Sequence, residues 1–92
     1  MNLSGILVTA DVTRLTDVMQ ALERLPGIEV RQHDAQTGRI VIVQEASDVD
    51  SEVEGFMRIR QMPDVWNVDL ICHYFGDDPQ ANVASDVAAA QA

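Results

Sequence analysis

Cys72 and His73, neighbours near the end of the chain, are the pair of residues best suited to catalysis in this sequence. A thiol beside a histidine can act as a nucleophile, and His33 and His73 can both act as bases. The pair, however, falls in a stretch that is typical of a β-strand, where successive side chains point to opposite faces. The histidine then does not activate the sulfur. We expect both histidines at the solvated rim of a sheet and the thiol as a small buried apolar group.

Other catalytic patterns are missing from the sequence. It has no glycine-rich phosphate loop and no GxSxG, and its single cysteine excludes both a CxxC ligand set and a disulfide within the chain. We therefore predict a protein that is not an enzyme and that has no catalytic residue, cofactor or metal site.

The charge limits the partners. Fifteen acidic residues against six basic ones give a formal net charge of −9, which repels nucleic acid and anionic membrane surfaces. The acidic excess serves either solubility or the attraction of a cationic ligand. The N-terminal stretch lacks the basic region of a signal peptide, and no segment is typical of a transmembrane helix. We expect a cytoplasmic protein that does not bind nucleic acid and does not insert into a membrane.

The sequence contains one helix-to-strand unit twice. RLPGIEV at residues 24–30 and RQMPDVWNV at residues 60–68 align on their prolines, and apolar residues three apart precede each proline. That spacing is typical of one face of a helix, and a proline followed by an apolar run marks the change from helix to strand. The repeat predicts two helix-turn-strand units in one domain.

The whole pattern predicts an α+β domain with the order βαββαβ. Strands are expected over residues 3–10, 28–33, 39–45 and 65–75, and helices begin at a cap (Asp11 or Thr13, then Ser47 or Asp48). The expected buried stripes are Val12, Leu15, Val18, Met19, Leu22 and Leu25 in the first helix, and Val49, Val53, Phe56 and Ile59 in the second. Right-handed crossovers give a four-stranded antiparallel sheet of order 4-1-3-2 with two helices on one face. Residues 1–78 form this domain, and the alanine-rich residues 79–92 are expected to be a flexible tail.

The other face of this sheet is left open, and its central strands are apolar on both sides. The residues predicted on the open face are Leu3, Gly5, Leu7, Thr9, Glu29, Arg31, Val41, Val43, Glu45, Asp69, Ile71 and His73. An apolar centre with a polar, partly acidic rim is typical of a protein-binding surface. Gly5 supports this interpretation, because a glycine in a central strand lets another backbone approach closely. A homodimer interface, or β-propensity without a binding role, would give the same pattern.

Four segments give the chain a family resemblance: SGILV (4–8), LPGIEV (25–30), TGRIVIVQEA (37–46) and PDVWNVDLICHYF (63–75). With them the chain resembles the NapD family, the small cytoplasmic chaperones of the periplasmic nitrate reductase. The resemblance implies a ferredoxin-like fold that binds the twin-arginine signal peptide of the catalytic subunit until its cofactors are inserted. A weak homodimer is the other partner we consider, and it follows from the apolar open face and not from the resemblance. The chain departs from the family pattern at Cys72, where members of the family often have a tyrosine.

The alternative from another class is an ACT-like regulatory domain, which shares the topology and binds a small molecule near the first strand-helix turn. That turn is TADVT here, without the glycine-rich stretch expected of such a site.

Overall fold

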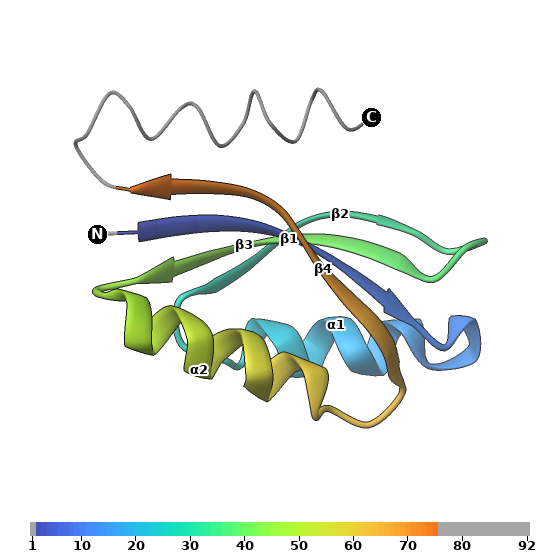
Figure 1. Ribbon diagram of the computed structural model, residues 1–92. Coiled ribbons are helices and arrows are strands. Elements are labelled where there is room, and N and C mark those ends of the chain that lie inside the picture. Colours follow the sequence, from blue (N-terminus) through green and yellow to red (C-terminus); the bar gives the residue numbers. More distant parts are fainter. Residues whose placement is uncertain (1, 76–92) are drawn as a thin grey trace.

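The computed structural model describes residues 2–75, and nothing is described for the side chains of the last two of these (Figure 1). The predicted domain end at residue 78 and the predicted tail therefore lie outside the described residues. The elements are β1 (Asn2–Ala10), a 3₁₀ turn η1 (Val12–Arg14), α1 (Leu15–Glu23), β2 (Ile28–Asp34), β3 (Arg39–Ala46), α2 (Val49–Arg60) and β4 (Val65–Phe75).

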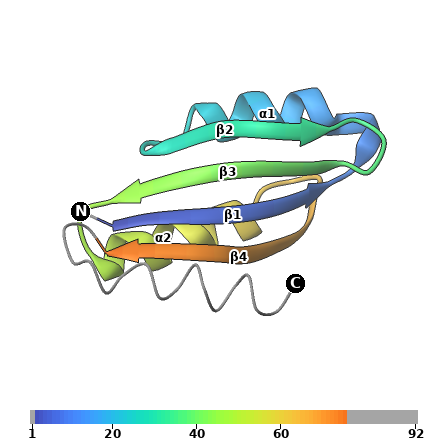
Figure 2. The ribbon, with the colours of Figure 1, turned by 90° about the horizontal axis from the view of Figure 1, so that it is seen from above.

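The four strands form one antiparallel sheet in the order β2-β3-β1-β4, as predicted. Both helices lie on the same side of it, with α1 along β2 and α2 behind β1 and β4 (Figures 1 and 2). The predicted βαββαβ architecture is confirmed, and the opposite face of the sheet has no helix over it in the described chain.

The doubled unit is visible in the turns that follow the helices. Gly27 and Asp64, each the residue after the proline, both have a positive φ, of 75° and 68°. Each turn uses the same pair of backbone hydrogen bonds, 37 residues apart: Leu25 N to Leu22 O and Ile28 N to Leu25 O, then Met62 N to Ile59 O and Val65 N to Met62 O. The sequence repeat is therefore a structural repeat of the helix-to-strand junction.

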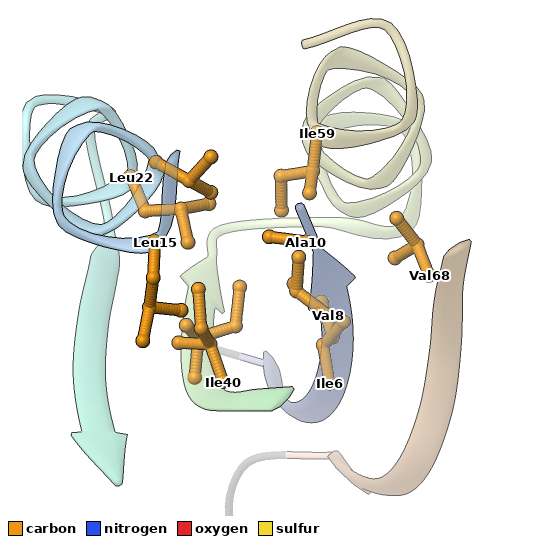
Figure 3. Close-up of a cluster of buried hydrophobic side chains, with 10 residues drawn as sticks. Ile6, Val8, Ala10, Leu15, Leu22, Ile40, Ile59 and Val68 are labelled. Carbon is orange, nitrogen blue, oxygen red and sulfur yellow. The ribbon is translucent and has the colours of Figure 1, made fainter. Parts of the chain in front are cut away.

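The core is aliphatic and lies between the helices and the sheet (Figure 3). Leu15, Val18 and Leu22 of α1 are buried as predicted, and Ile59 of α2 is fully buried against Ile6, Val8, Ile40 and Ile42 from the central strands. Val12 was expected in the buried stripe but lies in η1 with 42% of its surface exposed. Asp11 accepts hydrogen bonds from the Thr13 backbone and hydroxyl there, so that the chain turns before α1 begins.

The buried face of α2 differs from the prediction. Asp48 caps the helix by accepting the Ser51 N–H at 2.7 Å, as expected, but Glu52 is turned into the protein and only 7% exposed. Val49 and Val53, expected in the core, are 54% and 52% exposed. The hydrogen bonds of Glu52 described below account for this rotation of the helix.

Gly55 of α2 lies directly against the Gln44 side chain of β3. A β-carbon there would collide with the side-chain amide of Gln44, whose Nε2 donates to the Glu52 carbonyl oxygen at 3.0 Å. The glycine weakens the helix by roughly 1 kcal/mol relative to alanine, but it leaves room for this buried amide.

Candidate functional site

The open face of the sheet is built by the alternate residues of β1 and β3. Ser4, Ile6 and Val8 are buried on the helix side, whereas Leu3, Leu7 and Thr9 are only half-buried on the other side. The pairing of Leu7 with Val41 and of Gly5 with Val43 places the two central strands in the expected register. The centre of the open face is therefore apolar, as the sequence indicates.

A β-bulge in β4 changes which of its side chains reach this face. Ile6 pairs with Leu70 but Gly5 pairs with Cys72, so Ile71 is the extra residue and the alternation reverses after it. Asp69, opposite Leu7, lies on the open face as predicted, and Ile71 is 38% exposed. His73 was predicted on this face, and that placement is wrong: it lies on the helix side, against Glu52 of α2. Cys72, expected in the core, is half-buried on the open face instead.

The Cys72 side chain also changes the interpretation of Gly5. A β-carbon at Gly5 would lie 2.7 Å from the Cys72 Sγ, closer than such atoms approach. The lack of a side chain at Gly5 thus makes room for the neighbouring thiol within the sheet, and the close approach of an outside backbone is not needed to explain it.

The rim carries both signs of charge. Glu29 and Arg31 of β2 form an exposed ion pair at 3.5 Å, and Asp69 accepts a hydrogen bond from the Asn67 side chain at 2.9 Å. Glu45, opposite Leu3, and Glu29, opposite Val43, stand at one end of the face, whereas Arg39 stands opposite Thr9 at the other end. Sequence analysis did not include Arg39, although its odd position in the β3 alternation would have placed it there.

A buried polar cluster lies on the helix side of the sheet. Glu52 Oε1 accepts a hydrogen bond from the Ser4 hydroxyl at 2.6 Å and contacts His73 Nε2, and Oε2 accepts one from Asn2 at 3.4 Å. Sequence analysis missed this cluster. Its signal was the presence of two polar residues, Ser4 and Gln44, at core-facing positions of the central strands, where the other residues of the same parity, except Asn2, are aliphatic.

The geometry of this cluster is that of a structural anchor. A serine nucleophile needs a histidine base on its hydroxyl, whereas Ser4 donates directly to the carboxylate that also contacts His73. The cluster ties the ends of β1 and β4 to α2. Beside it lies a cavity of about 230 Å³ whose walls include Val49, Val53 and Leu70.

Comparison with known proteins decides the family. The family model described as NapD protein matches residues 1–77 of this chain. The chain belongs to the NapD family. It is 31% identical over 69 residues to the Chaperone NapD of Escherichia coli strain K12, an alignment that covers 75% of this chain and 79% of that protein. The Chaperone NapD of Shigella flexneri matches with the same identity and coverage.

A solved NapD structure shares the fold. The solution structure of the E. coli Tat proofreading chaperone protein NapD superimposes with a TM-score of 0.73 and 28% identity, covering 85% of this chain and 80% of that one. The matched NapD proteins are named as chaperones, and they support a chaperone role for this chain. Within residues 2–75, no helix has both the length and the apolar character needed to cross a membrane.

Proposed function

We propose that this NapD chain binds the twin-arginine signal peptide of the catalytic subunit of the periplasmic nitrate reductase, in the cytoplasm, and delays export until cofactor insertion is complete. The observation that carries the proposal is the sheet face that no helix of residues 2–75 covers, whose apolar centre around Leu7, Val41 and Val43 is half-exposed in a small acidic protein. The similar E. coli NapD is a Tat proofreading chaperone, which supports the same class of partner.

The peptide is proposed to lie across the open face as a helix, the usual way in which an amphipathic segment fills an apolar surface. Its contacts are the residues predicted from the sequence with Cys72 in place of His73, because the bulge in β4 reverses the two, and with Gln32 added, because the bulge at Arg31 sets Gln32 opposite Val41. Glu29 and Glu45 make one end of the face acidic, whereas at the other end Arg39 stands opposite Asp34, so that the two charges balance. The peptide arginines are therefore placed at the end near Leu3 and Glu45.

Calorimetry with the synthetic signal peptide tests the site. Leu7→Asp, Val41→Asp and Ile71→Asp each put a charge in the apolar centre and are expected to weaken binding about tenfold or more, a penalty of at least about 1.4 kcal/mol. Val12→Asp is the matched control, since Val12 is an exposed apolar residue on η1, away from this face. Circular dichroism confirms that each variant is folded.

The rim charges are expected to act differently. Exposed ion pairs contribute about 0.2–1 kcal/mol each and are screened by salt, so that binding falls only modestly between low and moderate ionic strength. Unchanged affinity in folded Leu7→Asp and Val41→Asp proteins would remove the open face from consideration. A thermal shift with free amino acids but none with the peptide would favour the ACT-like alternative.

A further inference from the structure

The two edges of the sheet are protected to different degrees. Both edge strands contain a bulge, but β2 has only seven residues and carries Glu29, Arg31 and Asp34. β4 is 11 residues long, and Asp69 is its only Asp, Glu, Lys or Arg. Long apolar edge strands offer unpaired backbone groups to another strand, and proteins usually shield them with charge or cover them. The β4 edge is shielded by little charge.

Exposed apolar side chains gather beside this same edge. Seven large apolar residues are exposed in the described chain, and six of them belong to α2 or β4: Val49, Val53, Met57, Trp66, Leu70 and Ile71. Val49, Val53 and Met57 recur every four residues, so they form one stripe along α2. Val49 and Val53 line a cavity together with Leu70, which shows that the stripe faces β4. We call Val49, Val53, Met57 and Leu70 the α2–β4 strip.

We propose that a second copy of this chain docks on the α2–β4 strip, with the two β4 strands paired antiparallel about a two-fold axis. The pairing would satisfy the backbone groups of both β4 edges and cover both strips at once. It would also join the two sheets into a single sheet of eight strands.

A single two-fold axis can pass through the centres of both β4 and the apolar stripe of α2. Leu70 is the middle residue of Val65–Phe75, so a two-fold axis there sets the two halves of β4 opposite each other. Val53 is the middle residue of the Val49–Met57 stripe and lines the same cavity as Leu70, so the two centres lie at the same level along the molecule. An isologous interface requires this coincidence, because each copy contacts the same patch on the other.

The charges of α2 fit an antiparallel copy of itself. The first half of the helix carries Asp48, Asp50 and Glu54 at the surface, whereas Arg58 and Arg60 are in its last turn. Arg60 follows Met57 by three residues and lies on the same side as the strip. A two-fold axis at Val53 would bring it to the beginning of the partner's α2, where the N-cap Asp48 is the nearest acidic residue. A parallel arrangement would place like charges together.

Sedimentation velocity tests the association. We expect the sedimentation coefficient of the full chain to rise between about 1 µM and about 1 mM, the range of a weak dimer. Val53→Asp, at a position 52% exposed in the single chain, is expected to shift the dimer dissociation constant about tenfold or more upward. Val12→Asp is again the control and should leave the dependence of the sedimentation coefficient on concentration unchanged. A monomer at all concentrations, or a dimer insensitive to Val53→Asp, would overturn the proposal.

Charge reversal tests the antiparallel orientation. Arg60→Glu is expected to weaken the dimer, and adding Asp50→Arg in the same chain is expected to restore it, because Asp50 lies about one helical turn from the position opposite Arg60, within reach of the long arginine side chain. Failure of the double variant to recover would exclude this orientation.

A cross-link tests the axis itself. In a Cys72→Ala background, Leu70→Cys faces its own copy within reach of a disulfide, and mild oxidation should give a covalent dimer. Val12→Cys in the same background should stay monomeric. Equal cross-linking of both variants, or none at Leu70→Cys, contradicts the pairing.

Discussion

At the scale of single residues, Gly5 and Cys72 form a pair that must be considered together. Their Cα atoms are partners across β1 and β4, and the thiol lies over the glycine. The sequence places a glycine in a central strand but does not show its neighbour, because a bulge of one residue brings Cys72 beside it. Leu70 and Ile71 are both apolar, so alternation alone does not reveal the extra residue.

We predict that Gly5→Ala is destabilising in the natural chain, because the new β-carbon would meet the Cys72 Sγ at 2.7 Å. In a Cys72→Ala background the same change should be neutral or stabilising, since alanine is favoured over glycine in a strand by roughly 0.5–1 kcal/mol. Urea denaturation of the four proteins gives the coupling free energy. A coupling near zero would show that the thiol is not what requires glycine here. Gly5→Leu is thus a poor probe of peptide binding, since it would strain the sheet.

Glu52 is the second residue whose role only the fold shows. Its helical position predicts a solvent-facing carboxylate, whereas its partners Ser4 and His73 are far away in the sequence. We predict that Glu52→Ala lowers the free energy of unfolding by about 2–4 kcal/mol, because it leaves buried donors without their acceptor. Glu54→Ala, an exposed change on the same helix, should alter it by less than about 0.5 kcal/mol. Similar effects in urea denaturation would contradict an anchoring role.

At the scale of elements, the helix caps and turns could be predicted from the sequence because they follow local rules. Proline ends both helices, and Asp48 begins α2, because these signals depend on neighbours in the chain. The rotation of α2 was not predictable in the same way. It depends on Glu52, whose hydrogen bonds join three separate elements, and on Gly55, which admits the Gln44 amide.

The Asp48 cap has a measurable pH dependence. The hydrogen bond from the Ser51 backbone N–H, followed by that from the Ser51 hydroxyl, holds the pKa of this carboxyl below its usual value of 3.8. Because the folded pKa is the lower one, the stabilisation is complete above the unfolded pKa and is lost as the pH falls through the folded pKa. We predict that the melting temperature of Asp48→Asn falls less steeply than that of the unchanged protein as the pH is lowered below about 4. Asp50→Asn, in the same helical turn, should change it less. The same dependence of melting temperature on pH in Asp48→Asn and in the unchanged protein would contradict this account.

At the scale of the whole molecule, the strand order followed from chain order and handedness alone, so it was predicted correctly. The open face was predicted for the same reason, since both crossovers place their helices on one side. The errors on the open face, His73 in place of Cys72 and the omission of Gln32, came from applying a uniform alternation to two strands that each have a bulge.

The proposed domain boundary can be tested on the intact fold. We predict that truncation after residue 78 leaves the melting temperature within a few degrees, because the composition of residues 79–92 offers few bulky apolar side chains to bury. Differential scanning calorimetry of the full and shortened chains measures this. A large drop would assign a structural role to the removed segment.

The pairing of Asn2 with Phe75 makes the two ends of the described fold neighbours in adjacent strands. A short linker can therefore close the chain there, and new ends can be opened in the turn between β2 and β3. Such a circular permutant would run β3-α2-β4-β1-α1-β2 and keep every strand pairing of the sheet. It would exchange the order of the two helix-turn-strand units, which have similar sequences at their helix-to-strand junctions.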